Sequence, residues 1–356
     1  MTKYNLKLKN IFYKNSKFKP MFKKMFKILL VSFSSIFVLA LIFLAYFNLP
    51  VRNVDKKVGI GVTFSLRYAQ DIGINWKDAY IAMLDELNIK KVRVPIYWDL
   101  VEPEKGKYNF SDIEWQLNEA QKRNAEVILV VGQKVPRWPE CFIPNWASGS
   151  DQEKKDNLLK FIETSVNHFK SYPAVKYWQV ENEPFLDFGI CPVADVSQID
   201  KEIEVVRKTD ASRKIVVTDS GELSLWIKAA KRADIFGTTM YREVVSSKVG
   251  AWKYPIGPNF FKFKRMLINI FVGQKNAIVI ELQGEPWLQG WTTGFPLDQQ
   301  LVSMNSEKLR DNVQFAKNSG FSDVYLWGVE WYYYLKVNHN YPDVWNTVKE
   351  IVRENN

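Results

Sequence analysis

Short apolar runs rich in β-branched residues alternate with longer segments of helical spacing through residues 51–356. This alternation is typical of a parallel sheet whose strands are joined by crossover helices. Eight runs read as strands: Val58–Phe64, Lys91–Pro95, Val127–Val131, Val175–Val180, Lys214–Thr218, Asp234–Met240, Ala277–Glu281 and Asp323–Trp327. The pattern predicts the α/β class and a single (β/α)8 (TIM) barrel, since such barrels commonly form one domain of about 250 residues or more.

The connecting segments carry the start and stop signals of helices. Ser111 can cap a first turn and Glu114 can reach back to it, and the segment Ser306–Asn318 stops just before Gly320. Residues 242–276 are too long for a plain connection, which predicts a lid or wall on the active-site face.

A doubly wound sheet is the structural alternative to a barrel. Gly59-Ile60-Gly61 begins like a dinucleotide-binding fingerprint, but the third glycine is missing and the pair lies inside a strand. No phosphate-binding P-loop sequence occurs either. We therefore expect no cofactor.

The N-terminal segment predicts a membrane-spanning helix. No charged residue occurs from Ile28 to Leu49, and at about 1.5 Å per residue such a helix reaches roughly 30 Å, the thickness of a hydrocarbon core. A cleaved signal peptide is the alternative, but its apolar core is only about 7–15 residues long. Leu44–Asn48 is also a poor cleavage site.

Charge is concentrated before this segment. Residues 1–27 contain nine lysines and no acid, so they account for nine of the chain's ten net positive charges. Lysines beside a span favour the cytoplasmic side, where anionic lipid attracts them. The sequence thus predicts a basic cytoplasmic tail (1–27), a single-pass anchor in the cell membrane (28–49) and an extracytoplasmic barrel domain (50–356). Nucleic-acid binding is not expected, because the tail lacks a recognition fold.

Cys141 and Cys191 are too few for a disulfide scaffold and are not spaced like metal ligands. We expect them to bond in an oxidising compartment, because the barrel layout puts them on adjacent loops at the same end. With only two histidines a histidine-rich metal centre is excluded, and no metal is expected. His168 is expected to be structural, whereas His339 could line the site.

Polar or aromatic residues stand at the ends of several strands, where a barrel of this type holds its active site. They are Arg93 at the second strand, Asn182 and Glu183 after the fourth, Tyr241 after the sixth, Glu281 at the seventh and Trp327 at the eighth. Hydrolysis of a glycosidic bond needs one carboxyl group to protonate the leaving oxygen and a second to attack or stabilise the sugar carbon. Glu183 and Glu281 are the candidates for these two roles.

The Asn-Glu-Pro sequence after strand four, with Glu ending strand seven, Arg at strand two and Trp at strand eight, resembles the retaining glycoside hydrolases of clan A, over residues 55–352. Tyr97–Phe110 is similar to the second-strand loop of β-galactosidases and β-xylosidases within this clan. The family within the clan stays open.

The resemblance implies a double displacement. Glu281 would attack the anomeric carbon, and Glu183 would act as acid and then base, with the carboxyl groups about 5–5.5 Å apart. The charge of Glu281 should raise the pKa of Glu183, while Arg93 and the Tyr241 hydroxyl keep Glu281 ionised. Asn182 would bind the sugar 2-hydroxyl, and Trp327 would form the floor of the subsite for the attacked sugar.

The chain also departs from the clan pattern. Glu285 lies four residues after Glu281, so it is an alternative functional acid, and Thr239 stands where some families have a histidine. Glu181 alternates with Glu183 and is expected to point into the barrel wall or a neighbouring loop.

Aromatic rings can stack on the apolar faces of sugars, and the chain has thirteen tryptophans. Candidates near strand ends are Trp98, Trp138, Trp287, Trp291 and Trp331. Trp138 and Trp287, each beside a proline in a loop, are favoured, whereas Trp115, Trp226 and Trp345 in helical segments are expected to pack in the core.

The leading hypothesis is a membrane-anchored retaining β-glycosidase that acts on a β-linked polysaccharide or oligosaccharide. The alternatives are a carbohydrate-binding or assembly protein that has lost catalysis, and a transglycosylase that uses the same intermediate. The sugar, the linkage, endo or exo action and the oligomeric state are left open.

Overall fold

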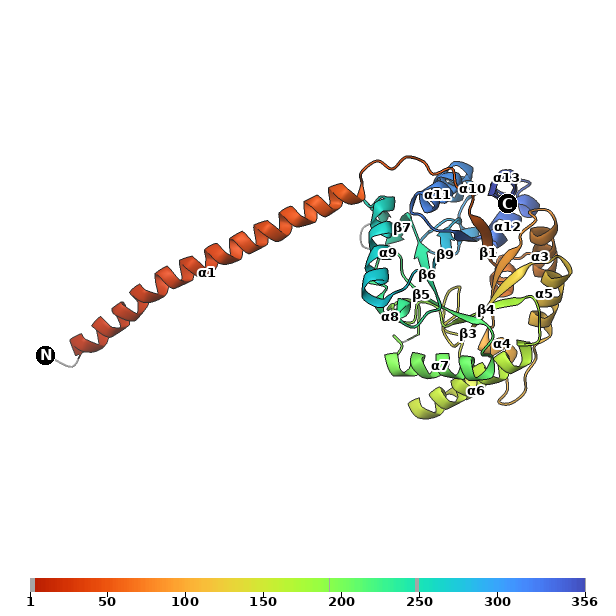
Figure 1. Cartoon of the computed structure of the whole chain (residues 1–356), viewed down its shortest axis with the longest axis horizontal. Helices are drawn as coiled ribbons and strands as arrows, with labels where there is room; N and C mark the ends of the chain where they lie inside the picture. The colour runs from red at the N-terminus through yellow and green to blue at the C-terminus, as the bar shows by residue number, and fades with distance from the viewer. Residues whose placement is uncertain (1–3, 192, 247–249, 356) are drawn as a thin grey trace.

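The computed structural model describes residues 4–191, 193–246 and 250–355, with side chains described from residue 23 onward. One long helix, α1 (Tyr4–Phe47), projects from the barrel formed by the rest of the chain (Figure 1). Its stretch Lys23–Phe47 is long and apolar enough to cross a membrane, and by length and composition it fits an anchor or a signal sequence. The tail predicted at residues 1–27 is helical from Tyr4, and Lys3 lies outside the described residues.

In the described part of the chain, eight parallel strands close into a barrel in the order β1-β10-β9-β6-β5-β4-β3-β2. This confirms the predicted fold and excludes the doubly wound alternative. The strands are β1 (Gly59–Thr63), β2 (Lys91–Pro95), β3 (Glu126–Val131), β4 (Val175–Val180), β5 (Lys214–Asp219), β6 (Ile235–Met240), β9 (Ala277–Gln283) and β10 (Asp323–Trp327).

Helices surround the strands. They are α2 (Leu66–Asp71), α3 (Trp76–Asp85), α4 (Trp98–Val101), α5 (Ser111–Lys122), α6 (Asp151–Phe169), α7 (Val196–Thr209), α8 (Ile227–Ala230), α9 (Pro258–Val272), α10 (Leu297–Ser303), α11 (Ser306–Asn318), α12 (Val329–Asn338) and α13 (Asp343–Asn355), with 3-10 turns at Asn145–Ala147 and Thr292–Gly294.

The core has two parts because alternate residues of a strand face opposite sides. Val127 and Leu129 of β3 belong to the large cluster shared with the helices. Ile128, between them, belongs to a smaller cluster with side chains of β5, β6, β9 and β10. This smaller cluster therefore fills the inside of the barrel. Its polar continuation toward the strand ends is the candidate site.

One predicted helix signal is wrong and one is confirmed. Ser111 does not cap α5, since the helix begins at Ser111 and Phe110 takes the cap position without a side-chain bond. The Asn109 side chain accepts the Ser111 N–H instead. The end of α11 is as predicted, with Gly320 in the left-handed region at φ 83°.

Residues 242–276 divide into two structures. The first is a hairpin of β7 (Glu243–Ser246) and β8 (Gly250–Lys253), and the part at 247–249 lies outside the described residues. Gln283 holds the hairpin, since its Oε1 accepts from the N–H groups of Arg242 and Glu243. The second is α9, a helix of the outer wall that packs against α8 and α11. The lid or wall prediction is therefore wrong for α9 and stays a prediction for the hairpin.

Candidate active site

Glu183 lies three residues after β4, on a loop with unusual backbone angles. Glu181 and Glu183 both have positive φ, at 57° and 43°, a region that side chains other than glycine seldom occupy. The Glu183 N–H donates to Thr218 Oγ1 at 2.8 Å, and its carboxyl oxygen accepts from Thr239 Oγ1 at 3.0 Å. Such backbone strain persists only where surrounding contacts hold it, and it clusters at functional sites.

Glu281 lies within β9, since the strand continues to Gln283, two residues beyond the predicted end. The register between β6 and β9 shifts just before Thr239 pairs with Glu281. Arg93 Nη1 donates to Glu281 Oε1 at 2.5 Å, and the Tyr241 hydroxyl donates to Oε2 at 2.9 Å. Both oxygens of this carboxylate therefore have a fixed donor.

Arg93 connects the chain segments that carry the two candidate acids. It is the middle residue of β2, not its last, and Val92 and Val94 on either side belong to the outer core, so its side chain faces inward. Besides Glu281, its guanidinium donates to Gln179 Oε1 at 2.8 Å and to Asn182 Oδ1 at 2.7 Å. This guanidinium is fully buried and bonds three side-chain acceptors. It therefore holds the polar side chains of the site in position and is not an ion pair at the barrel edge.

Asn182 keeps a free donor. Because its oxygen accepts from Arg93, the amide nitrogen Nδ2 must point the other way, and this buried atom has no partner in the structure. A buried donor without a partner costs free energy, so a ligand oxygen is the natural acceptor.

The carboxyl groups of Glu183 and Glu281 interact and differ in their surroundings. Burial is the largest cause that raises the pKa of Glu183 well above its usual value, followed by the charges of Glu281 and Glu140. The expectation named only Glu281, so the direction agrees and the dominant cause differs. Glu183 is 6% exposed and Glu281 is 3% exposed, yet only Glu281 has an arginine on its carboxylate.

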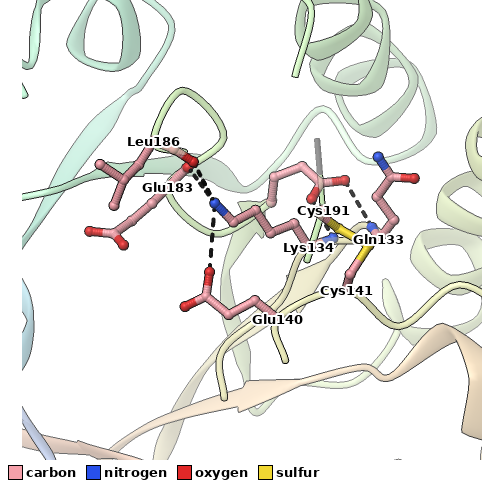
Figure 2. The surroundings of a disulfide bond; sticks show 8 residues. Gln133, Lys134, Glu140, Cys141, Glu183, Leu186 and Cys191 are labelled. Carbon is pink, nitrogen blue, oxygen red and sulfur yellow. Dashed lines mark hydrogen bonds and ion pairs between the residues drawn. A yellow bond between two sulfur atoms is a disulfide. The ribbon is translucent and has the colours of Figure 1, made fainter. Parts of the chain in front are cut away.

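A third carboxyl group, Glu140, was missed by sequence reasoning. Burial, opposed by Lys134 and reinforced by the charge of Glu281, raises its pKa to about 8. Lys134 lies between the acids: its Nζ is 3.6 Å from Glu140 Oε2 and donates to the Glu183 carbonyl at 3.1 Å (Figure 2). The sequence offered only a Trp-Pro-Glu-Cys stretch in a loop after β3, which carries no recognisable signal.

The disulfide Cys141–Cys191 joins the two loops that carry these groups (Figure 2). One loop follows β3 and the other follows β4, so they are neighbours at the same end of the barrel. Glu181 supports the same junction, since its carboxylate accepts from the N–H groups of Gln133 and Lys134. It therefore points into the neighbouring loop. Gly132 is required there, because a Cβ would lie 2.5 Å from the Glu181 carboxyl carbon.

Aromatic rings extend from Glu281 toward solvent. Trp287 packs edge-on against Tyr241 with centroids 5.0 Å apart, and Phe188 lies 6.1 Å from Trp287. Trp138 follows at 6.2 Å from Phe188 and is 59% exposed. Both favoured tryptophans therefore belong to one row of rings, and Phe188 is a member that the sequence did not reveal.

The other tryptophan candidates differ in position. Trp98 and Trp331 are fully buried and belong to the core, whereas Trp291 is exposed and stacks on Tyr68. Trp327 is nearly buried, and the Arg137 guanidinium covers one face of its ring at 4.1 Å.

Arg137 also explains Glu285. Its guanidinium pairs with Glu285 and with Glu330, the latter at 2.7 Å, so Glu285 belongs to a separate buried cluster. The histidines lie elsewhere: His168 bonds Glu114 on the helix layer, and His339 is exposed at the far end of α12 beside Tyr334. Among the described residues, no group of three His, Cys, Asp or Glu side chains could hold a metal ion.

The family model of the cellulases, glycosyl hydrolase family 5, matches residues 60–253, more than half of the chain. The chain belongs to this family. A curated relative, endo-1,4-beta-xylanase B of Thermotoga neapolitana, is 31% identical over 151 residues, which are 40% of this chain and 40% of the relative. The chain thus aligns with well under half the length of that xylanase.

Solved structures agree with the family's fold. A GH5_18 protein from Streptomyces cattleya, in complex with GlcNAc, superposes with a TM-score of 0.59 at 12% identity, covering 84% of this chain and 80% of that chain. Xylanase 10B from Thermotoga petrophila, in complex with xylobiose, has a TM-score of 0.54 at 16% identity, covering 84% and 94%. At these identities the likeness concerns the barrel alone.

Proposed function

We propose that the protein hydrolyses β-linked glycosidic bonds by a retaining double displacement. The observation that carries this proposal is that two interacting acids near the strand ends have different surroundings. Burial raises the pKa of Glu183, which favours its protonated form, while Arg93 and Tyr241 donate to both oxygens of Glu281. One group is thus suited to give a proton and the other to attack as an anion.

In the first step Glu281 attacks the anomeric carbon while Glu183 protonates the departing oxygen, giving a covalent glycosyl-enzyme. In the second step Glu183 takes a proton from water, which displaces Glu281 from the sugar. The Thr239 hydroxyl, a donor to Glu183, holds this acid in place through both steps. Two inversions leave the configuration of the sugar unchanged.

Substrate contacts follow from the groups left without protein partners. Asn182 Nδ2 is suited to donate to the 2-hydroxyl of the attacked sugar. The rings of Trp287, Phe188 and Trp138 offer apolar surfaces for further sugar units. On Trp327, only the ring surface not covered by Arg137 remains for a sugar. A row of rings with one end exposed fits a chain of β-linked sugars, and membership of the cellulase family supports this class of substrate.

We further propose that α1 anchors the barrel outside the cytoplasmic membrane, with the lysines inside. The uncharged segment supports a span, and the disulfide Cys141–Cys191 supports an oxidising compartment for the barrel. The end of α1 packs on the barrel through Phe47 and Phe260, which favours a retained anchor over a cleaved signal.

The test uses the full chain in detergent or nanodiscs, incubated with a panel of β-linked glycans, with release of reducing ends as the readout. Proton NMR of the first product should show the β-anomer before mutarotation. Glu281→Gln should abolish release, and Glu281→Ala with azide should give the glycosyl azide of inverted configuration. Full activity of Glu281→Gln on every glycan that the parent cleaves would refute the mechanism, and binding without cleavage would favour a carbohydrate-binding protein.

A further inference from the structure

The last turns of α1 pack on one barrel helix, α9. Phe43 contacts Phe263 with ring centroids 5.7 Å apart, and Phe47 contacts Phe260 at 5.3 Å. The chain after α1 is held there too, since Asn48 Nδ2 donates to the Pro255 carbonyl at 3.0 Å. A side chain at Gly257 would collide with the carbonyl oxygen of Phe47, so the two backbones approach closely.

The contact with α9 lies near the end of α1. Phe43 lies four residues before the end of the helix, which corresponds to about 6 Å of rise. No charged residue follows Lys27 until Arg52. The first turns of α9 therefore touch α1 inside its uncharged segment, at the end that would emerge from a membrane.

The exposed face of α9 carries three large apolar side chains and no acid. Phe261, Lys264 and Ile268 are its buried residues and pack on the barrel. On the outside, Met266 is 47% exposed, and Ile270 and Phe271 are each 65% exposed. The helix Pro258–Val272 contains no aspartate or glutamate; its cations are Lys262, Lys264 and Arg265, and Lys275 follows three residues after its end.

We propose that the outer face of α9, formed by Met266, Ile270 and Phe271, lies in the headgroup and acyl boundary of the bilayer that α1 spans. The inference rests on the anchoring role proposed for α1. A lipid surface fits because the face is continuous with the α1 contact, and an amphipathic helix with cations beside its apolar face binds at this depth, about 5–10 Å into the boundary. Lys262 and Lys275 are placed to meet lipid phosphates.

This contact sets the orientation of the barrel. α9 lies between β6 and β9 in the chain, so it runs along the barrel wall antiparallel to the strands, and the end of α1 lies beside it (Figure 1). A barrel that rests on α9 lies on its side, and the strand ends with Glu183 and Glu281 open along the membrane surface. The enzyme would then act on glycans that lie close to the membrane.

A single-thiol probe tests this surface in the full chain. Because the described residues contain no free cysteine, Phe271→Cys can be labelled selectively with an environment-sensitive fluorophore. The chain is reconstituted in liposomes of phosphatidylcholine and phosphatidylglycerol, some with a lipid-borne nitroxide quencher. Asn118→Cys, exposed on α5 at the opposite side of the barrel, is the matched control (Figure 1).

For the probe at position 271 we expect blue-shifted emission and loss of most of the signal in liposomes that carry the quencher. For the probe at position 118 we expect neither effect. If the protein floats with the liposomes but both probes emit alike and neither is quenched, the proposed membrane contact of α9 is refuted. The anchoring role of α1 is then unaffected. Protein that does not float would refute both. In a second variant, Ile270→Glu with a probe at Met266→Cys, quenching should be lost while hydrolysis of a short soluble oligosaccharide is unchanged.

Discussion

Replacing Tyr241 by phenylalanine isolates one bond at the proposed nucleophile. The substitution removes only the hydroxyl that donates to Glu281 Oε2 at 2.9 Å and leaves the ring on Trp287. Arg93 still holds Oε1, so the carboxylate remains but can turn away from its attacking position. A hydrogen bond to a charged group contributes about 1.5–3 kcal/mol, so kcat/KM should fall about 10- to 150-fold.

The assay is initial-rate hydrolysis of a β-linked glycan that the parent cleaves, with thermal unfolding in parallel. Tyr254→Phe, which removes a half-buried hydroxyl in the segment between β8 and α9, is the matched control and should keep the parental rate. Loss of one bond should lower Tm by no more than about 6 °C, so a rate loss measured well below Tm cannot be ascribed to unfolding. A Tyr241→Phe rate close to that of the parent would refute the assignment of Glu281 as nucleophile.

Three further predictions concern neighbouring groups. Glu183 must be protonated to act as an acid, so activity falls as pH rises through its pKa. The Glu140 charge raises this pKa, so Glu140→Gln should move the alkaline limb of the pH profile to lower pH. An unmoved limb would refute the coupling. Asn182→Ala should lower kcat/KM about 10-fold with a 2-hydroxyl substrate but little with its 2-deoxy analogue, and equal losses would contradict a 2-hydroxyl contact. Cys141→Ser with Cys191→Ser opens a link across 50 residues and should reduce the free energy of unfolding by about 2–4 kcal/mol, measured by urea titration; two reactive thiols in the native parent would contradict the bond.

The fold could be predicted from the sequence because the spacing of apolar residues in each strand and helix reflects which of its faces is buried. Runs such as Lys91–Pro95 and Asp323–Trp327 were bounded as the structure has them, since apolar periodicity ends where the chain leaves the core. The cap at Ser111 failed because the helix begins at Ser111 itself, and the Glu114 N–H that a Ser111 cap would accept donates to the Phe110 carbonyl. For 242–276, length alone suggested a lid, but 15 of these residues are an ordinary wall helix, α9.

Periodicity and residue type along the chain were enough to predict the barrel, an N-terminal helix apolar and long enough to cross a membrane, and the positions of Glu183 and Glu281 near the strand ends. The partners of these groups depend on contacts between segments far apart in the chain. Arg93 meets Glu281 across 188 positions and Thr239 meets Glu183 across 56, separations that no local pattern encodes. The raised pKa of Glu140 and the position of α9 against α1 could not be predicted either, since burial, charge coupling and helix contacts arise only when distant segments pack together.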